Sequence, residues 1–188
     1  MAAFFFNPLN LRLRELLLLI QSQGLCANLL GQQYWSMVPS LLGAGQAVKY
    51  TAIPRTHVDT TMPANPTPNF LRERLKAHLY DGEAVFDFCI QPQTNAVTMP
   101  IEDARIAWTS PFTKVATIRI PPQTFDSPEQ DEFGENLSYT PWHSLPEHRP
   151  LGGVNRARRV VYEAISRFRH IENDAPRTEP TTMQTFES

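Results

Sequence analysis

The chain has 188 residues, of which 41% are hydrophobic and 19% are charged, and its formal net charge is −2. This length suits one domain with a packed core and is short for two. The composition argues against a disordered chain, and the slightly acidic balance argues against a nucleic-acid-binding protein. The two cysteines, Cys26 and Cys89, lie far apart and outside zinc-binding spacings, so we expect free thiols and a cytoplasmic protein.

The first segment predicts a helix rather than a membrane anchor. Residues 9–23 follow Asn7 and Pro8, which suit the start of a helix, and they precede Gly24, which suits its end. Charged residues interrupt the apolar run of this segment at Arg12, Arg14 and Glu15. We therefore expect no membrane span.

The middle of the chain predicts an antiparallel meander. Apolar residues alternate with polar ones over short stretches that end at turn residues, as in half-buried strands. We expect strands at residues 46–53, 84–90, 104–108 and 114–120, a short helix at 70–80, and an irregular acidic connection at 124–135. The fold class is therefore expected to be α+β, with an open sheet whose edges something must cover.

The last predicted element is a helix over residues 154–170, and residues 173–188 are expected to form a flexible tail. Apolar residues recur along this helix and predict a core-facing side formed by Val154, Ala157, Val161, Ile165 and Phe168. Arg158 and Tyr162 fall on or beside this side and are four residues apart. Their side chains are therefore expected to be neighbours, about one helical turn from each other.

This pair has two interpretations. A phenol ionises at about pH 10 in water, but a nearby guanidinium and a ferric iron would both stabilise its anion. Arg158 and Tyr162 would then supply a supported tyrosinate iron ligand. Alternatively, Tyr162 is a core tyrosine and Arg158 reaches the surface along its apolar stem. The spacing is common in helices, so by itself it favours the second interpretation.

The wider sequence changes this balance. From Tyr139 to Tyr162 the chain reads YTPWHSLPEHRPLGGVNRARRVVY, which closely resembles the C-terminal signature of small catalase-related haem proteins. Residues 34–39, 45–50 and 101–108 resemble other parts of the same family. The resemblance implies that residues 1–172 form part of a catalase-like haem domain, with an incomplete β-barrel and the helix at 154–170 as the proximal haem helix.

The resemblance also implies a cofactor and the residues that hold it. In this family a tyrosine at the end of such a helical motif binds the haem iron, so Tyr162 would be the ligand of haem b and Arg158 the partner of its phenolate. Arg169 follows seven residues later, where catalases hold a haem propionate, and this spacing brings it to the same side of the helix. The implied substrate is hydrogen peroxide or an organic or fatty-acid hydroperoxide.

The distal side of such a site has no counterpart in the sequence. The family's distal histidine lies upstream of the position that corresponds to Phe4, and none of the five histidines lies in a similar segment: His57, His78, His143, His148 and His170. We therefore predict no catalytic residue in this chain. We expect a truncated piece of a longer protein, or a half that pairs with a complementary N-terminal half or in a homo-oligomer. Alone, it should bind haem weakly and turn over poorly.

A second hypothesis is a non-enzymatic interaction module. The helix carries a basic stretch from Arg156 to Arg169 that could contact an acidic partner. Nucleic acid is not expected as that partner, because the stretch lies on a helix with an apolar side and the whole chain is slightly acidic.

Overall fold

The computed structural model describes residues 24–177 without a gap, and residues 6–7, 10–11, 13, 16–17 and 20 before them. Most of the predicted helix at 9–23, and residues 178–188 of the predicted tail, lie outside the described residues. At the start of the chain, β1 (Phe6–Asn7) pairs with β2 (Asn10–Leu11). The remaining described elements form one α+β arrangement.

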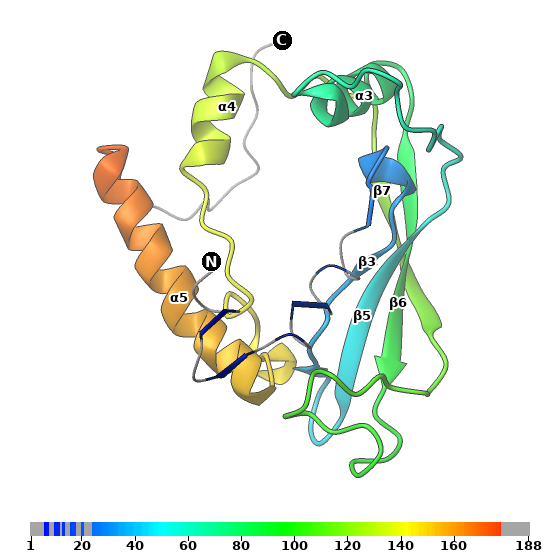
Figure 1. Cartoon of the computed structure of the whole chain (residues 1–188), viewed down its shortest axis with the longest axis vertical. Coiled ribbons are helices and arrows are strands. Elements are labelled where there is room, and N and C mark those ends of the chain that lie inside the picture. Colours follow the sequence, from blue (N-terminus) through cyan, green and yellow to red (C-terminus); the bar gives the residue numbers. More distant parts are fainter. Residues whose placement is uncertain are drawn as a thin grey trace.

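One antiparallel sheet and three helices make up this arrangement in residues 24–177. The helices are α3 (Phe70–Leu79), α4 (Pro128–Glu135) and α5 (Gly152–Glu172). Figure 1 shows the sheet together with α3 on one side of the molecule and α4 and α5 on the other. Among the described residues, no helix has the length and apolar character needed to cross a membrane.

The sheet has five strands, with each neighbouring pair antiparallel. They are β3 (Tyr34–Trp35), β4 (Ser40–Leu41), β5 (Ala47–Pro54), β6 (Ala84–Pro92) and β7 (Thr113–Ile120). The last three confirm the strands predicted at 46–53, 84–90 and 114–120. Both β3 and β4 pair with β5, so they form one interrupted edge. The chain between them passes through Met37, whose φ of 61° is unusual for a side-chain-bearing residue.

The strand predicted at 104–108 is wrong, because this segment forms turns. Asp103 is the physical cause. Its Oδ1 accepts the backbone N–H of Arg105 at 3.0 Å, and its two carboxylate oxygens also bind the guanidinium of Arg105 at 2.9 and 2.7 Å. An aspartate that bonds the backbone two residues on offers the chain an alternative to the extended conformation. The chain leaves this turn toward Trp108, which is buried.

The main core lies between the sheet and the segments that cover it, α3 and the 3-10 turn η1 (Leu29–Gly31). Its buried residues are Leu30, Leu79, Ala84 and Phe86. Further along β6, Cys89 and Gln91 are buried. Strict alternation from Ala84 and Phe86 would bury Phe88 and Ile90 instead. The pairing of β6 with β7 shifts register between Phe88 and Cys89, and such a shift exchanges the faces of all later side chains.

Helix α4 occupies a segment where the sequence analysis expects an irregular connection, so that expectation is wrong. The helix begins with a complete capping box. Ser127 Oγ accepts the N–H of Gln130 at 3.2 Å, and the Gln130 side-chain oxygen accepts the N–H of Ser127 at 3.0 Å. Pro128 then suits the first helical turn. Capping satisfies N–H groups that would otherwise lack partners and so stabilises a helix here. This stabilisation outweighs the tendency of an acidic, solvated segment to stay irregular.

Helix α5 confirms the helix predicted at 154–170, and its first turn is attached to the sheet. The chain passes through the 3-10 turn η2 (Pro146–His148) and then runs beside β4. There the Leu41 N–H donates to the Arg149 carbonyl at 2.9 Å, and the Leu151 N–H donates to the Pro39 carbonyl at 3.0 Å. These bonds fix where α5 starts.

The loop before β7 holds the same helix end. Gly152 has φ 84°, and a Cβ atom there would lie 2.8 Å from the Ile101 carbonyl oxygen, so only glycine suits this position. Glu102 Oε1 binds Arg156 Nη1 at 3.0 Å, and its Oε2 accepts the N–H of Gly153 at 2.8 Å. Both contacts stabilise the carboxylate and lower the pKa of Glu102. A carboxylate at the N-terminus of a helix also opposes the positive end of the helix dipole.

The side chain of Asn155 completes the attachment. It is 2% exposed, and its Nδ2 donates to the carbonyl oxygens of Pro39 and Leu151 at 3.0 and 2.8 Å. Its Oδ1 lies 3.4 Å from Nη1 of Arg158, which donates to it. The backbone carbonyl of Asn155 accepts the indole N–H of Trp142 at 2.8 Å. One residue thus connects the sheet edge, the helix and the segment that lies against the helix.

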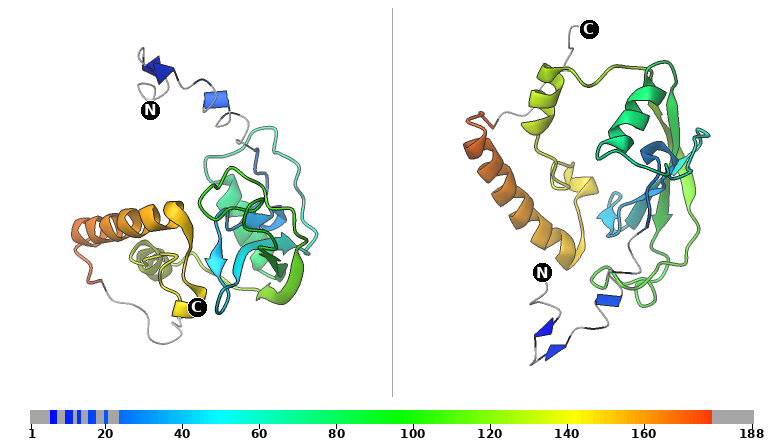
Figure 2. Two further views of the ribbon diagram at one scale, coloured as in Figure 1. Left: turned by 90° about the horizontal axis from the view of Figure 1, so that it is seen from below. Right: turned by 45° about the horizontal axis from the view of Figure 1, so that its top comes forward.

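The apolar side of α5 does not face a core, so the core-facing prediction is wrong. Val154 is 43% exposed and Phe168 is 59% exposed, and Ala157, Val161 and Ile165 are exposed as well. The helix instead turns a polar side toward its own chain, where Asn155 and His170 are buried. In Figure 2, α5 extends away from the sheet. The apolar residues therefore form a solvent-facing surface on this chain.

The sheet is open at β7. This strand pairs with β6 alone among the described residues, and its side chains from Thr113 to Arg119 are exposed. A strand edge with free N–H and C=O groups is a surface to which another strand can add. The sheet therefore does not close into a barrel within the described part of the chain.

Replacing Asn155 by leucine should destabilise the protein. The change keeps the branching and the number of heavy atoms of the side chain but leaves the Pro39 and Leu151 carbonyls without their side-chain donor, which costs about 1–3 kcal/mol for a buried group. Urea unfolding followed by circular dichroism measures the loss. Asn65→Leu is the control, because Asn65 is exposed and should change the free energy of unfolding by less than about 0.5 kcal/mol. Equal stability of the two variants would contradict the role given to Asn155.

Candidate functional site

The three residues singled out by the sequence lie along one side of α5. Tyr162 follows Arg158 by four residues and precedes Arg169 by seven, and in a helix both spacings bring side chains to nearly the same direction. Tyr162 is 40% exposed. Its hydroxyl has no hydrogen-bond partner within the described part of the chain. Its phenol is therefore neither packed into the core nor tied to a neighbouring group.

Three adjoining cavities meet at Tyr162. Their volumes are about 210, 270 and 350 Å³, and Ser138, Tyr139 and Tyr162 line all three. Trp142, His143, Arg159 and Arg177 also line the first, and Val161, Ile165 and Arg169 also line the second. The phenol thus adjoins a hollow that runs between α5 and the segment 137–143.

Arg158 is held by Asn155 rather than by Tyr162. Its Nη1 donates to Asn155 Oδ1 at 3.4 Å, and no carboxylate in residues 24–177 lies within ion-pair distance of it. Because the side chain of Asn155 is itself fixed by two hydrogen bonds, the guanidinium is kept one helical turn before the phenol. A positive charge at this place, without an acidic partner, stabilises an anion nearby.

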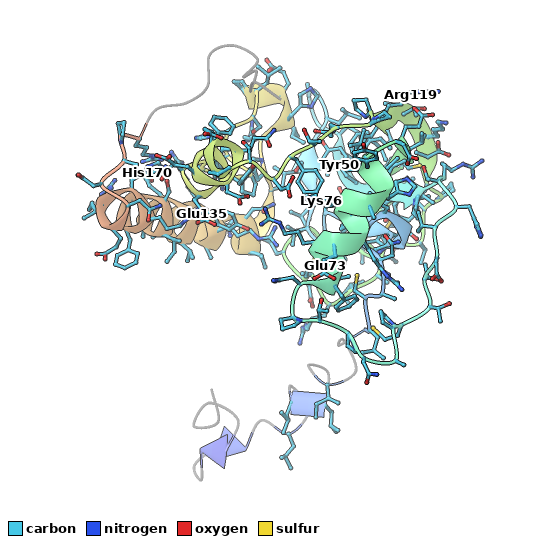
Figure 3. All side chains as sticks on the ribbon, turned by 90° about the horizontal axis from the view of Figure 1, so that it is seen from above. Tyr50, Glu73, Lys76, Arg119, Glu135 and His170 are labelled. Atoms are coloured by element: carbon cyan, nitrogen blue, oxygen red, sulfur yellow. The ribbon has the colours of Figure 1, made fainter. Side chains whose placement is uncertain are left out.

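Arg169 has a partner inside the chain, which the sequence analysis did not foresee. Its Nη2 donates to the Glu135 carbonyl and lies 3.3 Å from Glu135 Oε2. Glu135 ends α4, so this contact joins the two helices. Figure 3 shows Glu135 and His170 in this region, apart from the sheet. Arg169 lines the second cavity but is not free of other contacts there.

A polar network beneath the cavities was missed by the sequence analysis. Ser138 Oγ lies 2.5 Å from Ser166 Oγ and 3.2 Å from His170 Nε2. His170 is 8% exposed, and its Nδ1 has no hydrogen-bond partner among the described residues. The sequence could have indicated that Ser166 and His170 are neighbours, because they are one turn apart on α5. It could not have indicated their contact with Ser138, which lies 28 residues before Ser166. The network fastens segment 137–143 to the helix.

Trp142 fastens the other end of this segment. Its indole N–H donates to the Asn155 carbonyl, and the guanidinium of Arg159 lies 5.1 Å from the centre of its ring. This distance is within the range of cation–π attraction. His143 follows directly and lines the first and third cavities. Two polar anchors therefore hold the wall of aromatic and histidine side chains opposite Tyr162.

Three of the five arginines in the basic stretch of α5 pair with acidic side chains of the same chain. Arg156 pairs with Glu102 at 3.0 Å, Arg167 pairs with Glu163 at 3.1 Å, and Arg169 pairs with Glu135. A surface whose arginines already have acidic partners attracts a polyanion less than a row of unpaired ones. The structure therefore gives no specific support to the interaction-module hypothesis.

Comparisons with known proteins find the fold but not the sequence family. No family model matches the chain, and no curated protein matches it. Among solved structures, a fungal catalase matches with a TM-score of 0.63 and 15% identity, over 77% of this chain and 32% of the catalase. A bacterial catalase matches with a TM-score of 0.60 and 16% identity, over 87% of this chain and 37% of the catalase. The chain thus spans about a third of these catalases, and its fold is similar to part of the catalase fold.

Proposed function

We propose that this chain binds haem b through Tyr162 and supplies the proximal side of a catalase-related haem site. One observation carries the proposal: the Tyr162 hydroxyl adjoins three cavities and lies one helical turn after Arg158. Within residues 24–177 this hydroxyl has no hydrogen-bond partner and Arg158 has no carboxylate partner. A tyrosinate is the ligand that catalases use for haem iron. The catalase-like fold supports the same assignment.

The charges around the cavities suit this cofactor. Haem carries anionic propionates as well as iron, and it needs cations at its edge. Arg159, Arg177 and His143 line the first cavity, and the two arginines have no carboxylate partner in residues 24–177. Glu163 also lines this cavity, but its carboxylate is paired with Arg167. Arg169 would hold a propionate by exchanging its contact with Glu135 for one with the cofactor. The residues present therefore fit a haem on the side of Tyr162.

The proposed reaction uses peroxide as substrate, either hydrogen peroxide or an organic hydroperoxide, in the cytoplasm. When bound, haem supplies the iron that carries the oxygen chemistry. Tyr162 and Arg158 would hold and tune that iron, because a nearby guanidinium favours the phenolate over the phenol. Proton transfer on the peroxide side requires groups from elsewhere. The open edge of β7 and the apolar side of α5 support a complementary half or a second copy as their source.

Hemin titration of the purified chain tests the proposal. We expect an absorption and resonance Raman signature of high-spin ferric iron bound to a phenolate. Tyr162→Phe should remove this signature and weaken hemin binding by at least about tenfold. Loss of a residue that only supports a metal ligand commonly lowers metal affinity by that factor, so loss of the ligand itself should lower it at least as much. The matched control is Tyr139→Phe, because Tyr139 lines the same three cavities and should keep the signature.

A second arm separates tyrosine from histidine ligation. His143→Ala should leave the phenolate signature in place, since His143 lines two of the cavities but is not the proposed ligand. A signature that survives in Tyr162→Phe, or that disappears in His143→Ala or Tyr139→Phe instead, would show that the iron is bound elsewhere.

Replacing Arg158 by methionine should weaken hemin binding without removing the phenolate signature. The guanidinium lies one helical turn before the proposed ligand, and residues that support a metal ligand commonly contribute about tenfold to affinity. Arg158→Lys keeps a positive charge and should lose less affinity. Arg167→Met, which removes an exposed arginine paired with Glu163, is the control and should leave the hemin affinity unchanged. Equal hemin affinities of wild type and Arg158→Met would refute the supporting role.

A further inference from the structure

A separate cavity of about 380 Å³ lies on the sheet, and none of its lining residues belongs to the cavities at Tyr162. It is formed by the β3 edge, by β5 and β6, and by the loop that leads into β7. We call it the Lys49 pocket and define it by Trp35, Met37, Lys49, Tyr50, Trp108 and Phe112. Figure 3 shows Tyr50 in the sheet, well apart from His170 at the end of α5.

The aromatic walls of the Lys49 pocket are fixed by contacts behind them. Trp35 and Phe112 meet edge to face, with ring centres 5.4 Å apart. The buried side chain of Gln91 donates to the carbonyls of Trp108 and Ser110 at 3.0 and 2.7 Å. These bonds hold the loop that carries Trp108 against β6. Walls held in place before a ligand arrives lose little freedom on binding, which favours affinity.

Lys49 is the one charged group among the residues that line this pocket. Its Nζ lies 4.8 Å from the centre of the Trp108 ring, and no carboxylate in residues 24–177 lies within ion-pair distance of it. Burial lowers the pKa of Lys49, which means that its charged form is incompletely compensated. Burial also raises the pKa of Tyr50, which therefore stays neutral beside it. An anion bound in the pocket would form an ion pair with the Lys49 ammonium and stabilise its charged form.

We propose that the Lys49 pocket binds a small organic monoanion, a carboxylate carried on a planar aromatic body. The ammonium of Lys49 pairs with the carboxylate, and the rings of Trp35, Trp108 and Phe112 contact the body. Aromatic rings pack against one another edge to face or offset, so walls of this kind select a flat ligand. A single positive charge neutralises one carboxylate, whereas a second anionic group would be buried without a partner.

Binding of 2-naphthoate to the full chain tests this proposal, with tryptophan fluorescence and calorimetry as readouts. The neutral analogue 2-naphthamide has almost the same shape and should bind about tenfold more weakly, because it lacks the charge-assisted bond to Lys49. Lys49→Met should lower the affinity for 2-naphthoate to that of the amide and leave the amide unaffected. Lys49→Arg keeps the charge and should retain most of the preference for the carboxylate.

A second variant fills the pocket without touching its charge. Ala107 is exposed and lines the cavity, so Ala107→Phe should block both ligands while the thermal unfolding curve stays that of a folded protein. Ala96→Phe is the matched control, since Ala96 is exposed and does not line the cavity. Equal affinities for naphthoate and naphthamide, unchanged binding in Lys49→Met or Ala107→Phe, or no binding at millimolar naphthoate would each overturn the proposal.

Discussion

The hydrogen bonds of one buried residue, Asn155, fix the start of α5 and with it the position of Tyr162. Its amide spans from the sheet edge at Pro39 to the end of the preceding loop at Leu151. Its remaining acceptors take up Arg158 and Trp142. A buried amide with all its partners in place admits one arrangement, since any displacement leaves polar groups unpaired at a cost. The helix therefore leaves the sheet in one direction, and this direction fixes the position of Tyr162 two turns later.

This anchoring has a cost on the opposite side of the helix. Because α5 is held through polar residues, its apolar residues stay in solvent, among them Val161, Ile165 and Phe168. Full burial of such a side chain is worth roughly 1.5–3 kcal/mol, so a row of them is a substantial unused contribution to stability. Contiguous apolar surfaces of this kind on a folded chain mark contact sites. The open edge of β7 is a contact surface of another kind, because backbone N–H and C=O groups at a strand edge can pair with a further strand.

The sequence predicts those parts of the fold that depend on neighbours in the chain. Alternation locates β5, β6 and β7, and helical spacing locates α5 and the relation of Arg158 to Tyr162. The failures have local physical causes as well. Asp103 turns the chain where alternation suggests a strand, and the capping box of α4 was visible as Ser127 and Gln130 but lay in an acidic stretch. The register shift in β6 had no sequence signal.

Helical spacing also cannot say which side of a helix is buried, because that depends on contacts with distant residues. The spacing of α5 predicts that its apolar side is buried, whereas the hydrogen bonds of Asn155 and the contact of Ser138 with His170 bury a polar side instead. Each of these contacts joins residues that are far apart in sequence. The sequence did not predict the Lys49 pocket for the same reason, since its lining residues come from four separate segments of the chain.

The distribution of charge links the two proposed sites. Ion pairs engage most of the lysines and arginines in residues 24–177, and those without a carboxylate partner are Lys49, Arg149, Arg158, Arg159 and Arg177. Four of these five line a proposed site or flank Tyr162. An uncompensated cation beside a cavity raises the affinity of that cavity for anions, whereas a paired cation does so far less. Internal pairing on the rest of the surface thus leaves positive charge concentrated where an anionic cofactor or ligand would use it.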